Sequence, residues 1–112
     1  MKPEVRLTVG AEQDLAALYR RRLTQRGADG ADGADAMLDA VVAAIEGLAE
    51  HPLRGPVVPE LEGLGIRAYR QLSLPPLRII YLPEETAITI LIAADARRDF
   101  RTLLEERLLR GQ

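Results

Sequence analysis

The chain has 112 residues, of which 47% are apolar and 29% are charged, and its formal net charge is −2. This length suits one domain with a buried core, and the composition indicates a globular protein rather than a disordered one. The chain has no cysteine, which excludes disulfides and thiolate metal sites, and its net negative charge argues against a general nucleic-acid coat.

Neither end of the sequence suggests a membrane or an export route. The N-terminal segment MKPEVRLTV lacks the apolar core of a signal peptide. The longest apolar run, residues 87–94 with Thr89 inside it, is far too short to cross a bilayer. We therefore expect a cytoplasmic protein with one domain over residues 1–112.

The charges are distributed unevenly. Residues 27–64 carry eight acids against Arg54 alone, whereas residues 65–82 carry three arginines and no acid. Residues 97–112 carry five arginines against three acids. An acidic chain can therefore still present one positive face.

The first third of the chain predicts a strand and a helical hairpin. Residues 5–9 alternate as a short strand, and helical spacing from about Gly10 to Arg26 predicts a helix that Gly27 ends. The repeat GADGADGAD lacks the oxygen spacing of a calcium loop, so it reads as a flexible connection whose last Asp caps the next helix. That helix ends at His51-Pro52. Its apolar stripe is Leu38, Val42, Ile45 and Ala49, flanked by Met37, Val41 and Leu48.

The second half predicts three strands and a terminal helix. A loop over residues 53–65 leads into strands at 66–72, 77–82 and 87–93, and the short turn at 83–86 makes the last two an antiparallel hairpin. The C-terminal helix starts near Asp99. The order β-α-α-β-β-β-α predicts an α+β fold, with the helical hairpin packed on one face of a small antiparallel sheet and the other face partly open.

Several chemistries are excluded by residue type. One serine, Ser73, and one histidine, His51, lie outside any nucleophile pattern, so a Ser-His-Asp triad is not expected. One histidine without cysteine does not make a zinc site, and no phosphate-binding glycine motif follows a strand. We expect neither a metal nor a cofactor.

Arginines remain as candidate functional groups. Arg70 and Arg78 come from adjacent predicted strands, and Arg97 and Arg98 follow the last strand. If these side chains converge at one end of the sheet, they can grip phosphate bidentately. Alternatively, Arg78 is paired with an acid on the face of the sheet, while Arg97 and Arg98 are solvated. The pattern leaves both possibilities open.

Several motifs together resemble the RelE/ParE superfamily, the toxins of type II toxin–antitoxin systems that are also called plasmid stabilisation proteins. The motifs are DLAALY, LAEHPLRG, a Pro-Glu-Leu loop, YRQL, LRIIY and TILIAADARRDF, followed by a leucine-rich tail. The resemblance covers nearly the whole chain. It implies the fold described above and a cognate antitoxin with which the toxin forms a hetero-oligomer.

The resemblance leaves two activities open. RelE-like members cut mRNA on the ribosome, and that branch implies catalytic roles for Arg78, Arg97 and Arg70. However, residues 100–110 offer no Tyr or His, so a candidate base is missing. ParE-like members inhibit DNA gyrase, and the segment Asp95–Asp99 resembles their RRD ending. We favour the ParE-like branch, in which Arg97, Arg98 and Arg101 contact the target.

A third possibility is an inactive module that binds a partner. All three readings imply an antitoxin. We expect it to cover the apolar stripe of the C-terminal helix: Phe100, Leu103, Leu104 and Leu108.

Overall fold

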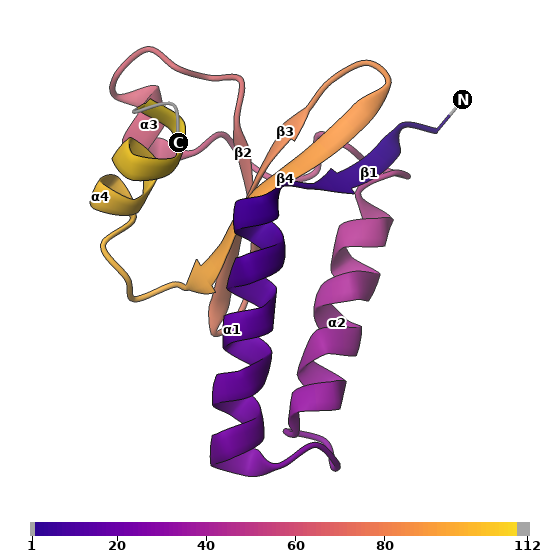
Figure 1. The fold of residues 1–112 in the computed structure, drawn as a ribbon. Helices are drawn as coiled ribbons and strands as arrows, with labels where there is room; N and C mark the ends of the chain where they lie inside the picture. The colour runs from indigo at the N-terminus through magenta and orange to yellow at the C-terminus, as the bar shows by residue number, and fades with distance from the viewer. Residues whose placement is uncertain (1, 110–112) are drawn as a thin grey trace.

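The computed structural model describes residues 2–109 as a helical hairpin and three shorter helical segments around a four-stranded sheet (Figure 1). The predicted α+β class and element order are confirmed. One short helix, α3, adds to them. The elements are β1 (Glu4–Leu7), α1 (Val9–Arg26), α2 (Ala34–Gly47), α3 (Pro59–Glu62), β2 (Arg70–Leu74), β3 (Leu77–Pro83), β4 (Ala87–Asp95), α4 (Phe100–Leu104) and a π-helical turn (Glu105–Leu109).

Helix α1 has a defined cap at each end. Thr8 Oγ1 accepts a hydrogen bond from the Ala11 N–H at 3.0 Å, so the helix begins at Val9 and strand β1 is shorter than predicted. At the other end Gly27 adopts φ 76° and donates its N–H to the Leu23 carbonyl at 2.9 Å. A positive φ favours glycine, which confirms the predicted stop.

Helix α2 differs from its prediction at both ends. Its N-cap is Gly33, whose added Cβ would lie 2.4 Å from the Asp29 carbonyl oxygen, and no side chain caps the helix. The prediction that the last Asp of the repeat caps it was wrong. Asp35 lies in the first turn and accepts a 2.6 Å hydrogen bond from the Tyr19 hydroxyl. The helix ends at Gly47, four residues before His51.

The predicted apolar stripe of α2 was also displaced. Val41, Ile45 and Leu48 are the residues buried against the sheet, whereas Val42 is 42% exposed. Apolar residues occupy most positions of this helix, so periodicity could not decide which side faces the core.

The sheet has the strand order β1-β4-β3-β2. Strands β2, β3 and β4 form the predicted antiparallel meander, and β1 adds to β4 in parallel. Strand β2 starts four residues later than predicted, because the Ile66 N–H donates to the Leu61 carbonyl in the turn after α3. Strand β4 extends two residues beyond its predicted end, to Asp95.

A bulge in β4 sorts the side chains of the sheet onto two faces. Ile80 pairs with Ile92 and Tyr81 pairs with Ile90, which leaves Leu91 as the extra residue. Ile90 and Ala93 therefore face the helical hairpin, whereas Leu91 and Ile92 face the other side. Without this bulge, strict alternation would place Ile90 and Ile92 on the same face.

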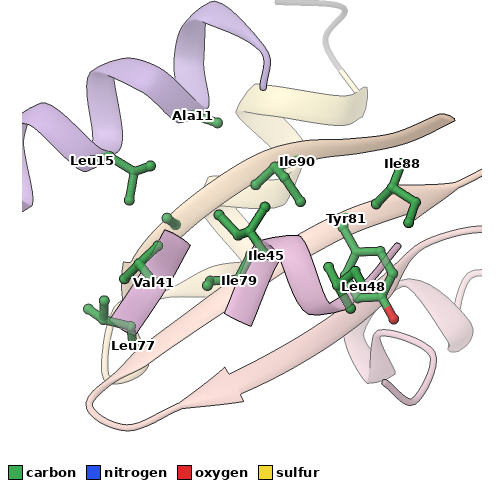
Figure 2. Packing of buried hydrophobic residues seen from close by; sticks show 11 residues of the cluster. Ala11, Leu15, Val41, Ile45, Leu48, Leu77, Ile79, Tyr81, Ile88 and Ile90 are labelled. Carbon is green, nitrogen blue, oxygen red and sulfur yellow. The ribbon is translucent and has the colours of Figure 1, made fainter. Parts of the chain in front are cut away.

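The first core lies between the sheet and the helical hairpin (Figure 2). Strands β3 and β4 present Ile79, Tyr81, Ile88 and Ile90 to α1 and α2, and each of these four residues is fully buried. Full burial of an aliphatic side chain of this size stabilises the folded state by about 1.5–3 kcal/mol.

The second core covers the opposite face of the sheet, which was predicted to be partly open. Leu61 and Val58, from α3 and the residue before it, pack with Ile80 and Ile92 of the sheet. The C-terminal residues Phe100, Leu103 and Leu104 complete this cluster and are at most 5% exposed. The prediction failed because residues 53–65 were read as a plain loop, although Pro59 in this segment is typical of the first position of a helix.

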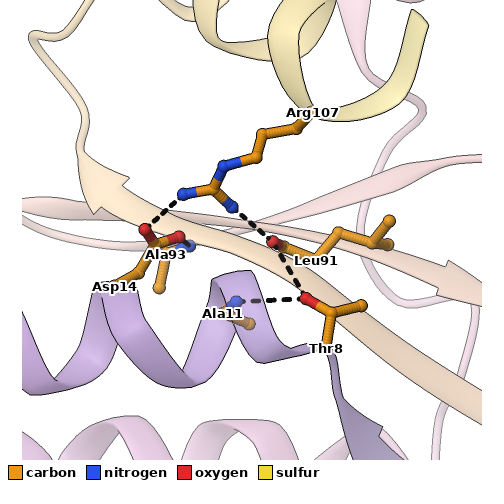
Figure 3. Close-up of polar contacts among 6 residues, drawn as sticks. All are labelled: Thr8, Ala11, Asp14, Leu91, Ala93 and Arg107. Carbon is orange, nitrogen blue, oxygen red and sulfur yellow. Dashed lines mark hydrogen bonds and ion pairs between the residues drawn. The ribbon is translucent and has the colours of Figure 1, made fainter. Parts of the chain in front are cut away.

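The edge of β4 beyond β1 is closed by side chains (Figure 3). Strand β1 pairs with β4 only as far as Ile90. Beyond that point Asp14 accepts the Ala93 N–H at 3.0 Å, and Arg107 donates to the Leu91 carbonyl at 2.9 Å. Asp14 and Arg107 also form an ion pair in which both side chains are mostly buried. This cluster joins α1, β4 and the π-helical turn.

The loop before α3 approaches the sheet through a glycine. The Gly55 N–H donates to the hydroxyl of the fully buried Tyr81 at 3.1 Å, which satisfies the one polar group of that side chain. A Cβ at Gly55 would lie 2.0 Å from the Gln71 carbonyl oxygen.

No helix within residues 2–109 is long and apolar enough to cross a membrane.

We expect Gly55→Ala to destabilise the fold by about 2–3 kcal/mol, because the loop must move away from β2 and the Tyr81 hydroxyl loses its donor. Urea denaturation measures the change. Gly63→Ala is the matched control, since its nearest atom is 3.9 Å away and its φ is −61°. Equal midpoints for the two variants would contradict the close-approach argument.

We expect Arg107→Met to destabilise the fold by about 2–3 kcal/mol, because it leaves the Asp14 carboxylate without its counter-charge and the Leu91 carbonyl with only the long 3.5 Å hydrogen bond from Thr8. A double-mutant cycle with Asp14→Asn should give a coupling above about 1 kcal/mol. Arg6→Met is the control, because the Arg6–Glu4 pair is exposed and contributes little. Additive effects of Arg107→Met and Asp14→Asn would show that the pair is not coupled.

Candidate functional site

Arg78 lies on β3, on the face opposite the helical hairpin, and every nitrogen of its guanidinium group is engaged. Nη1 and Nη2 donate to the two carboxylate oxygens of Glu60 on α3, at 2.9 and 2.7 Å. Nε donates to the side-chain oxygen of Gln71 on β2 at 2.7 Å. The guanidinium carbon also lies 4.4 Å from the ring centroid of Phe100, in a cation–π contact. Arg78 thus ties α3 and α4 to the sheet.

The Glu60 carboxylate is stabilised in its ionised form. The hydrogen bonds from Arg78 lower its pKa below the ordinary value of 4.5, and partial burial opposes that shift. The charge of Arg78 adds to the lowering, with a smaller contribution from Arg101. At neutral pH the pair is therefore a bidentate salt bridge, with side chains 14% (Arg78) and 29% (Glu60) exposed.

Arg70 lies on the other face of the sheet. It pairs in register with Tyr81, and its neighbour Leu72 packs into the first core, so alternation places Arg70 on the helical-hairpin side. Its Nη1 donates to the carbonyl oxygens of Gly55 at 2.8 Å and Leu53 at 3.3 Å. Arg70 therefore holds the loop after α2 rather than joining Arg78.

Arg97 and Arg98 lie in the exposed segment between β4 and α4. Arg97 wraps back onto Asp95, with Nε and Nη2 each 2.9 Å from a carboxylate oxygen. Hydrogen bonds from the Arg97 side chain and backbone hold the pKa of Asp95 far below its usual range. Arg97 still exposes 87% of its side chain. Asp99 then caps α4 by accepting the Thr102 N–H.

The predicted convergence of the arginines is not what the structure shows. Arg78 and Arg70 lie on opposite faces, and Arg97 lines a hollow on the α1 side of the sheet, beyond the end of β4. The alternative comes closer: Arg78 is paired with an acid, although Glu60 belongs to α3 and not to the sheet, and Arg97 and Arg98 are exposed, although Asp95 holds Arg97. Sequence reasoning missed the partners of Arg78. The signal for Glu60 was Pro59, a residue typical of the first position of a helix.

Arg101 occupies a separate place, on the exposed side of α4. It lines a shallow hollow between α3 and α4 together with Glu60, Leu64 and Glu105. Leu64 is 64% exposed there.

The apolar stripe of the C-terminal helix is covered by the domain itself. Phe100, Leu103 and Leu104 are buried, and Leu108 packs against the same cluster. The stripe is thus not left open for a partner in the isolated chain. Contact between an antitoxin and these residues remains a prediction.

Residues 2–109 contain no cluster of three or more His, Asp or Glu that could hold a metal ion. His51 and Ser73 are both exposed, on the turn after α2 and on β2. The groups that contact the Arg78 guanidinium are an ionised carboxylate, an amide and a phenyl ring. None of these groups is suited to accept a proton as a general base near neutral pH, since the pKa of Glu60 is lowered.

Comparison with known structures identifies the fold. The chain is similar to the chromosomal ParDE toxin–antitoxin system from P. aeruginosa, with a TM-score of 0.66 and 20% identity, over 84% of this chain and 96% of that one. It is also similar to the toxin–antitoxin complex RelBE2 from Mycobacterium tuberculosis, with a TM-score of 0.58 and 25% identity, over 85% and 99% of the two chains. No curated protein sequence matches significantly.

The sequence itself matches a protein family. Residues 5–101 fit the family described as the ParE toxin of the type II toxin–antitoxin system parDE. The match runs from β1 through the first residues of α4, so it includes both faces of the sheet and the arginine segment after β4. The chain therefore belongs to the ParE toxin family within the RelE/ParE superfamily.

Proposed function

We propose that this toxin acts in the cytoplasm by inhibiting DNA gyrase, and that a cognate antitoxin neutralises it in a hetero-oligomer. The observation that carries the choice of target is the commitment of Arg78. Its guanidinium group gives four of its five N–H donors to Glu60 and Gln71 and lies over the ring of Phe100, so it serves the fold. Membership of the ParE family supports the same direction.

Cleavage of mRNA is the alternative, and the geometry around Arg78 does not favour it. Attack by a 2′-hydroxyl needs a group that accepts its proton, and arginine stays protonated. A phosphate would also have to displace Glu60 from a bidentate, charge-assisted pair before it reached Arg78. The three arginines expected for a RelE-like site, Arg78, Arg97 and Arg70, lie apart.

The exposed arginines around α4 are the proposed target contacts. Arg97, Arg98 and Arg101 lie on the surface between the end of β4 and the first turn of α4. Arginine is enriched among the residues that dominate protein interfaces, since it combines charge, five donors and an apolar stem.

An antitoxin partner is supported by the solved relatives, which are toxin–antitoxin complexes. We propose that the antitoxin engages the C-terminal helix. Because Phe100, Leu103 and Leu104 are buried, such a partner either binds the exposed side of α4 or displaces the helix from the second core.

We expect the purified toxin to inhibit supercoiling of plasmid DNA by gyrase and to trap cleaved DNA. Replacing Arg97, Arg98 and Arg101 together by Gln should weaken inhibition by roughly tenfold or more. Arg6→Gln, on β1, is the matched control and should inhibit as the wild type does.

Primer extension on translating ribosomes is the companion measurement. Intact mRNA together with growth arrest fits the proposal. New cuts within codons that vanish in Arg78→Met would instead establish the ribonuclease. Unchanged supercoiling at saturating toxin, with a known gyrase poison active alongside, would rule out gyrase as the target. No growth defect on expression without antitoxin would point to an inactive binding module.

The Arg78–Glu60 pair predicts a pH dependence of stability. Because the folded-state pKa of Glu60 is lowered, its contribution is fully present above pH 4.5 and is lost as the pH falls through the lower folded value. We expect Glu60→Gln to lose about 1–2 kcal/mol at pH 7 and to show a flatter stability curve than the wild type below pH 4.5.

Urea denaturation from pH 7 to pH 3 measures this effect. Glu62→Gln is the control, since Glu62 pairs with Arg67 in an exposed ion pair that contributes little. If the stability of the wild type and of Glu60→Gln falls in parallel below pH 4.5, the salt bridge does not account for the loss of stability at acidic pH.

A further inference from the structure

A basic groove runs between the second half of α1 and the end of β4. Two adjacent hollows form it, and Leu18, Arg21 and Asp95 line both. Arg22 and Arg97 line the first hollow, and Arg98 lines the second. The groove thus brings four arginines from two distant parts of the sequence to one place.

The acids of this groove neutralise only one of its four arginines, Arg97. Asp95 is held by Arg97, and Asp14, at the far wall, is held by Arg107. Within residues 2–109 no carboxylate lies within ion-pair distance of Arg21 or Arg98, and no ion pair joins Arg22 to a carboxylate either. Arg22 donates to the carbonyl of Asp32 instead. Arg21, Arg22 and Arg98 therefore form no ion pair within residues 2–109, although the charge of Arg21 still acts on nearby Asp95, on a chain whose net charge is −2.

We propose that this groove binds the phosphates of duplex nucleic acid. Guanidinium groups match phosphate oxygens bidentately, and several of them along a groove can follow a backbone. The inference rests on the proposed function, because duplex DNA is the substrate on which gyrase acts. The toxin would then hold the enzyme and its DNA together.

Two other anionic partners fit the groove less well. Binding of single strands depends on aromatic platforms for the bases, and no aromatic residue lines either hollow. An acidic peptide that adds as a strand needs a free sheet edge. Here Asp14 and Arg107 already occupy the backbone groups of Ala93 and Leu91 at the edge of β4.

Fluorescence anisotropy with a labelled 20-base-pair DNA duplex of arbitrary sequence tests the proposal. For about three phosphate contacts, log K should fall against log salt with a slope near −2.7, which is roughly a 40-fold loss between 50 and 200 mM salt. The double variant Arg21→Gln/Arg98→Gln should bind at least about tenfold more weakly at 50 mM, with a slope reduced by about two.

Arg6→Gln is the matched control. Arg6 is an exposed arginine that pairs in register with Thr89, so β4 carries it six residues away from Asp95. It should keep the affinity and the salt slope of the wild type. Circular dichroism should show that all the variants are folded, since the substituted arginines are exposed or line a groove rather than a core.

Three results would overturn the proposal. The wild type fails to bind the duplex at 50 mM salt, the double variant binds it with an unchanged slope, or a poly-glutamate peptide or a single strand binds through Arg21 and Arg98 while the duplex does not.

A gyrase assay separates the groove proposal from the proposed function. If Arg21→Gln still poisons gyrase, the groove is not needed for inhibition, and the proposed function stands without it. If the toxin binds the duplex through Arg21 and Arg98 but has no effect on gyrase, the groove proposal stands and the proposed function fails.

Discussion

The contact between Asp14 and Arg107 joins parts of the chain that are 93 residues apart, and the two-sided architecture depends on it. Strand β1 ends before β4 does, so the backbone of β4 at the bulge would otherwise lose its partners inside the protein. A buried backbone group without a partner costs about as much as a lost hydrogen bond. Asp14 and Arg107 supply the missing partners and thereby fix the C-terminal turn against the first helix (Figure 3). Gly10 fits this arrangement, since a Cβ there would lie 2.9 Å from the Arg107 guanidinium.

The bulge explains why one sheet carries two cores. By inserting Leu91, it turns Ile92 toward α3 and α4 while Ile90 remains against the helical hairpin. Arg78 contacts the second core through the ring of Phe100, and its charge is met by Glu60. An arginine that is bound on every nitrogen stabilises the fold, and four of its five N–H donors are already given to Glu60 and Gln71. These contacts account for the place of Arg78 in the fold without any role in catalysis.

The parts of the fold that follow local chemistry could be predicted from the sequence. Periodicity found α1 and the β3–β4 hairpin, and Gly27 marked a helix end through its positive φ. The parts that depend on distant contacts could not be predicted. Glu60 meets Arg78 only because α3 closes the second face, and Arg21 approaches Asp95 only because α1 crosses the end of β4. Neither pair is close in sequence, so spacing carries no signal of it.

The difference between arginines that are paired within the fold and arginines that are exposed also indicates where a target is expected to bind. Two arginines, Arg70 and Arg78, lie on strands of the sheet. Backbone carbonyls bind the first and a carboxylate pairs with the second, because a half-buried charge must be paired. Arg21 on α1 and Arg98 in the segment after β4 are exposed to solvent, so they have no such constraint. A protein that binds rather than cuts needs no perturbed base, only donors that are held in fixed positions and are not yet satisfied. The end of β4 meets that requirement and the face of the sheet does not, so the surface around Arg98, rather than the site of Arg78, is where a target is expected to bind.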